Sequence, residues 1–171
     1  MSETATRRRR GLRLAAAFAA PTLVAVLAVA AVAVVAGPGT LLALVPARQV
    51  PVPADDAAPV VVVRAYLDAL DAHDLDTARA VLTPERRVAV EQSQGNWFVN
   101  LRSVRNVRLD PAVDAPHSRG AYRQAVRVPA ELDVTLFFET AGREGGSLTW
   151  GFVLVRNGPE EPWRIADEGP A

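Results

Sequence analysis

The residues of this chain that could carry acid–base chemistry are few. A proton-transfer enzyme needs a carboxylate base and a donor such as tyrosine facing each other across an apolar pocket. After residue 58, the candidates that could point inward are Tyr66, Tyr122, Asp133 and Glu139. The only imidazoles in the sequence are His73 and His117. No pattern in the sequence pairs a tyrosine with a carboxylate, so we predict no catalytic residue.

Each of these candidates has a simpler expected role. Tyr66 lies on the apolar side of a predicted helix, where it would fill the core. Asp133 and Glu139 alternate with Val134, Leu136 and Phe138, which puts the two acids on the solvent face of a strand. His73 ends a helix, where it can cap the helix dipole, and His117 belongs to a Pro-His-Ser loop.

Other kinds of site are also not indicated. The chain has no cysteine, which excludes a disulfide, a thiolate nucleophile and a cysteine-ligated metal. The histidines have no partner at metal-ligand spacing, and no serine sits in a Gly-x-Ser-x-Gly frame. The glycines at 142–146 fit a hairpin loop rather than a phosphate-binding loop. We therefore predict no metal and no cofactor.

Aromatic residues are the remaining candidates for a binding site. They line a ligand pocket or fill the core, and the sequence leaves both interpretations open. The residues are Tyr66, Trp97, Tyr122, Trp150, Phe152 and Trp163.

The elements that position these residues change character along the chain. Apolar residues at helical spacing predict a helix over Pro59–His73, a second one capped by Asp74, and a third capped by Thr83 that ends near Gln92. Strands are then predicted, separated by Pro, Gly and Asn, over 101–109, 122–128, 132–140, 148–156 and 163–166. Because Pro129 cannot donate to a ladder, Val128 to Leu132 should be a break or a bulge at a sheet edge, and Gly151 should mark a bulge or bend. This order predicts an α+β domain of about three helices on a curved antiparallel sheet of four to five strands.

A membrane segment precedes this domain. Residues 14–36 form an uncharged run of 23 residues, long enough to cross about 30 Å of hydrocarbon as a helix. The basic tail, residues 1–13, carries five arginines, so the positive-inside rule places the N-terminus in the cytoplasm and the C-terminal domain outside. Because the membrane orientation accounts for these arginines, we expect no nucleic acid partner. Cleavage after Ala33 or Ala36, which would secrete the domain, remains the alternative.

The two halves of the chain have opposite charge. The net charge of zero combines +5 over residues 1–48 with −5 over residues 49–171. Between anchor and domain, residues 37–58 are rich in Gly and Pro, which is typical of an extended linker. The predicted organisation is a tail (1–13), an anchor (14–36), a linker (37–58) and an extracytoplasmic domain (59–171).

Two segments of the domain resemble a known superfamily. The run Ala65 to Arg79, AYLDALDAHDLDTAR, resembles the opening helices of the nuclear-transport-factor-2-like superfamily. Residues 150–156 followed by 162–169 resemble the last hairpin of its exported, lipoprotein-like, uncharacterised members. The resemblance covers residues 59 to 169. It implies a cone-shaped domain whose sheet and helices enclose a pocket, but the fold does not select an activity.

Together these observations favour a membrane-anchored binding or scaffold module without catalysis. We expect it to contact the bilayer through residues 14–36, and to bind a protein partner, a second copy through the sheet face, or a small apolar ligand. The alternative is an exported isomerase, dehydratase or cyclase that uses a Tyr and carboxylate pair.

Overall fold

A computed structural model of the chain describes residues 46–93, 97–118, 120–139 and 144–171. These residues all belong to one compact unit, Pro38–Ala171. The predicted anchor (14–36) and basic tail (1–13) lie outside the described residues. Among the helices that the structure describes, none combines the length and the apolar character needed to cross a membrane.

Three helices come first, and the sequence predicted their starts correctly. They are α3 (Pro59–Asp71), α4 (Leu75–Ala80) and α5 (Pro84–Gln92), followed by a single unpredicted turn, α6 (Trp97–Asn100). The Asp74 side chain accepts a hydrogen bond from the Thr77 backbone N–H at 3.2 Å, and the Thr83 hydroxyl accepts one from the Arg86 N–H at 3.2 Å. Both predicted N-caps are confirmed, because each satisfies a backbone donor that the helix itself leaves unpaired.

The end of α3 is fixed by a residue in the left-handed region. His73 has φ of 56°. Its N–H donates to the Leu70 carbonyl (3.2 Å), and the next N–H, of Asp74, donates to the Ala69 carbonyl (2.8 Å). This pair of bonds is a Schellman motif, which closes the last turn of the helix and reverses the chain. His73 therefore acts at the helix end, as predicted.

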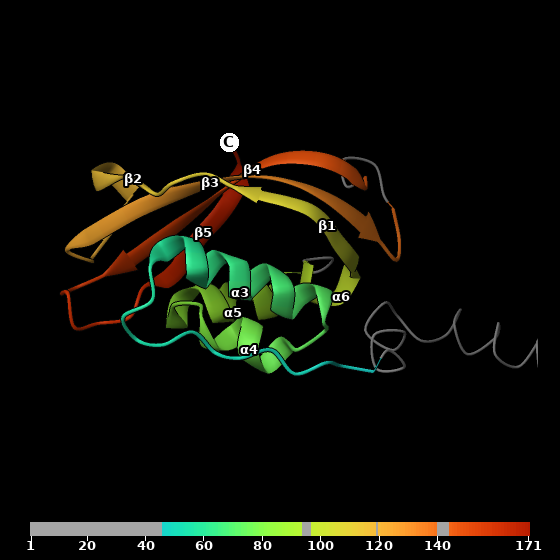
Figure 1. Cartoon of the computed structure of the whole chain (residues 1–171), viewed down its shortest axis with the longest axis horizontal. Coiled ribbons are helices and arrows are strands. Elements are labelled where there is room, and N and C mark those ends of the chain that lie inside the picture. The colour runs from blue at the N-terminus through green and yellow to red at the C-terminus, as the bar shows by residue number, and fades with distance from the viewer. Residues whose placement is uncertain (1–45, 94–96, 119, 140–143) are drawn as a thin grey trace, which may run out of the picture. The chain divides into compact units, whose positions relative to one another are not determined.

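The second half of the domain is an antiparallel sheet. Its strands are β1 (Leu101–Leu109), β2 (Val113–Asp114), β3 (Gln124–Leu136), β4 (Gly146–Arg156) and β5 (Arg164–Pro170), and η1 (Pro116–Ser118) follows β2. The strand order is β1-β3-β4-β5, and β2 extends the sheet by pairing with β3. The sheet curves over α3, with α4 and α5 beyond it (Figure 1). The predicted α+β class is confirmed.

One prediction about the strands was wrong. Pro129 does not break the sheet, because β3 runs through it without a register shift against β4, with Pro129 opposite Gly151. The Pro129 carbonyl accepts a hydrogen bond from the Asp110 N–H at 3.0 Å, so the proline nitrogen faces the same side. On that side β1 has ended at Leu109 and β2 begins at Val113. The missing N–H therefore removes no ladder bond.

Gly151 also differs from the prediction, since β3 and β4 pair regularly at this position. A Cβ at Gly151 would lie 2.4 Å from the Arg127 Nε, because the Arg127 guanidinium crosses the strand there and donates to the Pro170 carbonyl at 3.3 Å. Gly151 therefore leaves room for the Arg127 side chain and does not mark a bulge. The hairpin loop predicted at 142–146 falls partly outside the described residues.

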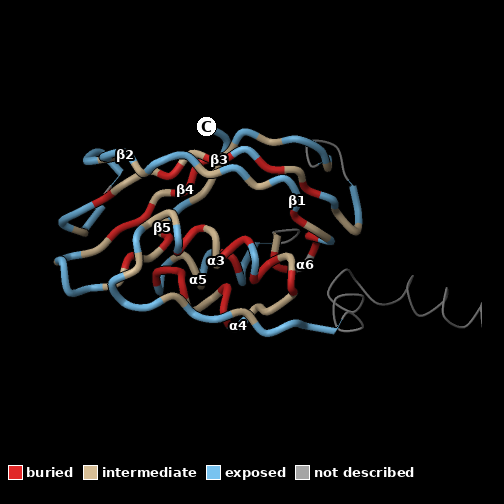
Figure 2. The backbone as a smooth tube through the Cα atoms, viewed as in Figure 1, coloured by how far each residue is buried: buried red, intermediate tan, exposed pale blue. Residues whose placement is uncertain are grey.

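The core lies between α3 and the inner face of the sheet (Figure 2). Alternate residues of β3 and β4 point inward, as the period of two requires. Val128, Leu132 and Val134 of β3 and Phe152 and Leu154 of β4 are at most 4% exposed. They meet the apolar face of α3, which is formed by Val62, Val63, Tyr66, Leu67, Ala69 and Leu70.

Part of the predicted linker lies on the domain. The Arg48 N–H donates to the Ala72 carbonyl at 2.9 Å, and the Val50 N–H donates to Asp74 Oδ2 at 2.9 Å. The Thr77 hydroxyl donates in turn to the Val50 carbonyl at 3.0 Å. Val50 and Ala57 also pack against the core. We call residues 48–57 the strap, because this segment runs alongside α3 instead of standing free as a spacer.

Asp74 joins the strap to the helices, and its removal has a predictable cost. Asp74→Ala removes the N-cap of α4 and leaves the Val50 N–H unpaired. We expect the free energy of unfolding to fall by about 1–2 kcal/mol, the usual cost of a lost cap. Urea denaturation followed by circular dichroism measures this change.

Asp76→Ala is the matched control, since the Asp76 side chain is fully exposed and bonded only to Arg79 at 3.6 Å. It should change stability by less than about 1 kcal/mol.

The Val50 N–H lowers the pKa of Asp74. A lowered folded-state pKa gives stability that is complete above the unfolded pKa and is lost as pH falls through the folded pKa. Asp74→Ala should lack this acid-dependent loss. Equal stability of Asp74→Ala and Asp76→Ala at neutral pH would contradict the role of Asp74.

Candidate functional site

A buried Tyr-carboxylate-Arg cluster is the main polar feature of the interior. Glu168 of β5 points inward, and its Oε1 accepts a hydrogen bond from the Tyr66 hydroxyl of α3 at 3.1 Å. The same oxygen accepts a second bond from Arg86 Nη2 of α5 at 3.0 Å. Arg86 Nη1 also pairs with Asp167 at 3.3 Å. We call Tyr66, Arg86 and Glu168 the interior triad; it connects three elements far apart in the sequence.

Burial dominates the electrostatics of the interior triad. Tyr66 is fully buried, and the Glu168 side chain is 8% exposed. Burial, and then the charge of Glu168, raise the pKa of Tyr66 well above its usual value, so the phenol stays protonated and donates. Burial also raises the pKa of Glu168, against the opposing influence of Arg86 and of the Tyr66 hydroxyl.

The cluster leaves some polar atoms unsatisfied. Among the described residues, four buried side-chain atoms have no hydrogen-bond partner: Glu168 Oε2, Arg86 Nε, Arg87 Nε and Trp150 Nε1. Such atoms normally cost free energy. Glu168 Oε1 therefore accepts two hydrogen bonds, whereas Glu168 Oε2 is buried and has no partner among the described residues.

Tyr66, one of the six predicted pocket residues, belongs to the interior triad, and three others, Phe152, Trp97 and Trp150, form ring pairs with it or with each other. The Tyr66 and Phe152 rings meet edge to face at 6.0 Å, and the Trp97 and Trp150 rings stack at 5.2 Å. Phe98 connects the two pairs, since its ring lies 6.3 Å from Tyr66 and it neighbours Trp97 in α6. Trp150 lies two residues before Phe152 on the same inner face of β4. Phe152 also lies opposite Glu168 in the pairing of β4 with β5.

The other two predicted pocket residues lie elsewhere. The Trp163 ring is buried under the Arg156 guanidinium, which stands 4.3 Å from the ring centroid. The Tyr122 hydroxyl donates to Glu85 at 3.2 Å in an exposed position. Burial, and then the hydrogen bond to Glu85, raise the pKa of Tyr122. Trp163 belongs to the apolar core that also contains Tyr66, and Tyr122 is bonded to Glu85 in the first turn of α5.

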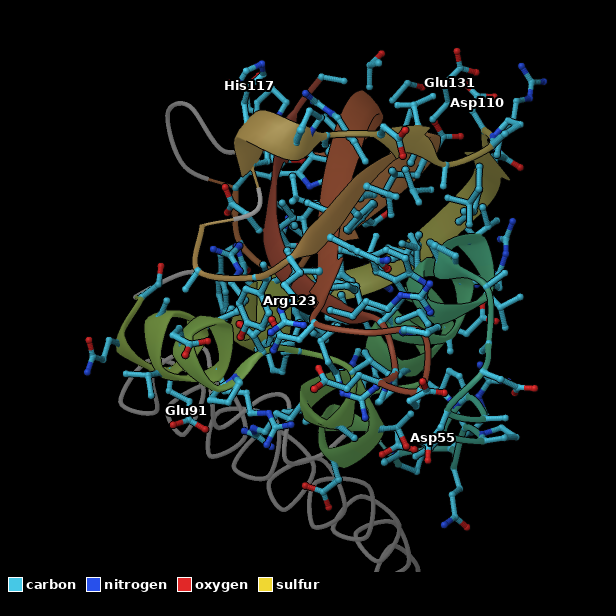
Figure 3. All side chains as sticks on the ribbon, turned by 90° about the vertical axis from the view of Figure 1, so that its left-hand side faces the viewer. Asp55, Glu91, Asp110, His117, Arg123 and Glu131 are labelled. Carbon is cyan, nitrogen blue, oxygen red and sulfur yellow. The ribbon has the colours of Figure 1, made fainter. Side chains whose placement is uncertain are left out.

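The remaining sequence candidates do not converge on a site. Asp133 accepts hydrogen bonds from Ser147 (2.5 Å) and Asn106 (2.6 Å) on the outer face of the sheet, and these lower its pKa. Glu139 accepts from the Gly145 N–H at 3.1 Å. Asp133 therefore lies on the outer face of β3, as predicted. Glu139 is exposed, but it lies beyond the end of β3 at Leu136 and not on the predicted strand. His117 lies in η1, on the left-hand end of the domain in Figure 1, which faces the viewer in Figure 3.

The carboxylate of the interior triad was missed, because a bulge changes its face. Alternation from Trp163 and Ile165 predicts that Asp167 points inward and Glu168 outward. The register shifts at this point, with Leu154 opposite Ile165 and Val153 opposite Asp167, so Ala166 is an extra residue. The bulge turns Glu168 inward, opposite Phe152. A single sequence carries no signal for this shift.

The search for a metal site and the comparisons with known proteins add no identification. Within the described residues, no three His, Asp or Glu side chains come together in a metal-binding group. Comparison of the whole chain with protein-family models, curated proteins and solved structures gives no match.

Proposed function

We propose that this protein is a membrane-anchored, extracytoplasmic binding or scaffold module without catalytic activity. The anchor is the apolar run at 14–36, and the arginine-rich tail (1–13) sets its orientation. The domain belongs to the cone-shaped, nuclear-transport-factor-2-like type; its helices followed by an antiparallel sheet are consistent with that assignment.

One observation carries the non-catalytic part of this proposal. The tyrosine and carboxylate that an enzyme of this type would use are enclosed together: Tyr66 is 0% exposed, and the free oxygen of Glu168 is buried. Arg86 occupies the other oxygen. A small apolar ligand could occupy this place only if the surrounding rings moved apart. The interior triad therefore fits a structural role, in which it joins α3, α5 and β5.

The outer face of the sheet is the surface that we assign to a protein partner or a second copy. The described helices cover only the opposite, inner face (Figure 1). Polar groups on the outer face are engaged with one another, as in the Arg108–Glu131 ion pair at 3.1 Å and the bonds around Asp133. A polar face of this kind suits reversible association, because non-obligate interfaces resemble the rest of the surface in polarity.

Membrane retention tests the proposal, with cleavage and secretion as the alternative. The full chain carrying a C-terminal tag should stay in the membrane fraction after an alkaline carbonate wash, at the mass of the uncleaved chain. A shortened chain in the soluble fraction would instead establish secretion. Sedimentation of the full chain in detergent separates a module that binds a second copy from one that stays monomeric.

The Tyr66–Glu168 contact favours one second function, an exported isomerase, dehydratase or cyclase. Tyr66 would act as the proton donor and Glu168 as the base, because a raised carboxyl pKa strengthens a base and a protonated phenol donates. Tyr66→Phe and Glu168→Gln test this alternative on any turnover that is found. Folded variants that keep the full rate would end it.

A further inference from the structure

One end of the domain carries partly exposed aromatic side chains beside arginines. Phe138 is 41% exposed, its neighbour Phe137 is half-buried, and so is Trp97 in α6, the element whose Asn100 binds the Phe138 backbone. The arginines are Arg48, with 76% of its side chain exposed, and Arg102, which is also exposed. His73 completes the group, with its ring 6.1 Å from that of Phe137. We call these residues the strap-end surface: Arg48, His73, Trp97, Arg102, Phe137 and Phe138.

Contacts bring these residues to the same end of α3. The Arg48 N–H binds the Ala72 carbonyl, and the Arg48 guanidinium pairs with Asp71 at 3.6 Å. Asp71 also accepts from the Val104 N–H of β1 at 2.9 Å. The segment that follows β3 lies at this end as well, because the Phe138 backbone exchanges two hydrogen bonds with the Asn100 amide of α6. In Figure 1 the beginning of the strap, α6, the start of β1 and the end of β3 all lie toward the right-hand end of the domain.

We infer that the strap-end surface rests on the lipid bilayer that holds the anchor, with anionic head groups as its ligand. This inference rests on the proposed membrane anchor. Only residues 37–47 lie between the anchor and Arg48, and eleven residues span at most about 40 Å. Among the described residues, Arg48 is the first whose backbone N–H binds a carbonyl at the helices, so along the chain this end of the domain follows the anchor most closely.

The side chains at this end match a head-group region. Tryptophan and other aromatic rings favour the boundary between hydrocarbon and water, and arginines extend their guanidinium groups toward lipid phosphates. Three acids of this end have partners: Asp71 with Arg48, Asp133 with Ser147 and Asn106, and Glu139 with the Gly145 N–H. Glu144, which precedes Gly145 in the β3–β4 loop, is exposed. No contact in the described structure occupies the Arg102 guanidinium.

The opposite end of the domain has a different character. The strap runs back along α3, and the thirteen residues of this helix put about 20 Å between Arg48 and the turn at Asp55 and Asp56. Glu160 and Glu161 lie in the β4–β5 turn, and Asp55 acts on the nearby Arg164 of β5. Figure 3 views this end, with Asp55 labelled. Anionic lipid would repel these acids, which favours the strap end as the contact.

Site-specific labelling tests this contact in the full chain. Because the protein lacks cysteine, Phe138→Cys and Asn157→Cys each give one labelling site for the fluorophore NBD. Asn157 lies in the β4–β5 turn and is the matched control. Each labelled chain is reconstituted into nanodiscs of phosphatidylcholine and phosphatidylglycerol in equal parts, with and without a lipid that carries a nitroxide on its head group.

We expect the nitroxide lipid to quench NBD at position 138 and to leave NBD at position 157 nearly unchanged. Arg48→Glu combined with Arg102→Glu should reduce the quenching at 138, whereas Arg123→Glu, an exposed residue at the opposite end, should not. Circular dichroism confirms that each variant is folded.

The possible failures are distinguishable. Equal, weak quenching at both positions in a chain that is inserted in the nanodisc would overturn the contact and leave the anchor intact. A chain that does not co-purify with nanodiscs would overturn the anchored function itself, and the inference with it. Unchanged quenching in the double arginine variant would overturn the assignment of anionic head groups as the ligand.

Discussion

Glu168→Ala is expected to lower the free energy of unfolding by about 3 kcal/mol or more, because it removes one partner of a buried ion pair. Arg86 Nη2 and the Tyr66 hydroxyl both donate to the same Glu168 oxygen. After the substitution, a fully buried hydroxyl and a guanidinium with 22% exposure lose that acceptor. Leaving buried donors without partners costs more than the pair itself contributes. Urea denaturation of the full chain in detergent measures the loss.

Asp167→Ala is the matched control for Glu168→Ala. Asp167 pairs with the same Arg86 guanidinium at 3.3 Å, but its side chain is 70% exposed. Exposed pairs contribute about 0–1 kcal/mol, so this variant should stay close to the parent. Similar losses in the two variants would contradict the importance that we give to burial of the interior triad.

The pH dependence of Glu168 gives a second measurement. Its folded-state pKa is raised, so the folded protein binds more protons than the unfolded chain between the two pKa values. Stability should therefore fall as pH rises from the ordinary carboxyl range through the raised pKa. Glu168→Gln keeps an acceptor oxygen but cannot ionise, and it should lack this component. An unchanged pH profile would contradict the raised pKa.

Phe152→Ala is expected to destabilise the domain by about 3–5 kcal/mol, the usual cost of removing a buried phenylalanine. The Phe152 ring is 0% exposed and lies edge to face with Tyr66. Its loss would leave a cavity beside the interior triad, because β3 and β5 hold the strand backbone in place on both sides. Thermal and urea denaturation both report this change.

Phe138→Ala is the control for Phe152→Ala, since Phe138 is 41% exposed. It should cost less than about 1 kcal/mol, because little apolar surface is lost from the core. If Phe152→Ala were equally mild, the inner face would not be the closed, packed core that this account requires.

Local signals in the sequence predicted much of the fold. The side-chain oxygens of Asp74 and Thr83 start α4 and α5 because each can reach a nearby backbone N–H, a property of the residue and its neighbours alone. The alternation of β4 likewise depends on short spacing, and β1 begins and ends where predicted.

The features that were missed depend on distant parts of the chain. Pro129 is tolerated only because β1 ends and β2 begins beside it. Glu168 reaches the interior only because Ala166 is an extra residue against β4. The strap is held by Asp74, which lies 24 residues after Val50. Arg86 was not a candidate, since its role appears only once α5 and β5 lie together.

The central claim is that the domain is exported and held at a membrane by residues 14–36. A fusion of alkaline phosphatase after Ala171 tests it most directly in a bacterial host, because this enzyme is active only outside the cytoplasm. We predict an active phosphatase that remains in the membrane fraction. An inactive fusion, made at full length and in normal amount, would place the domain in the cytoplasm and contradict the account.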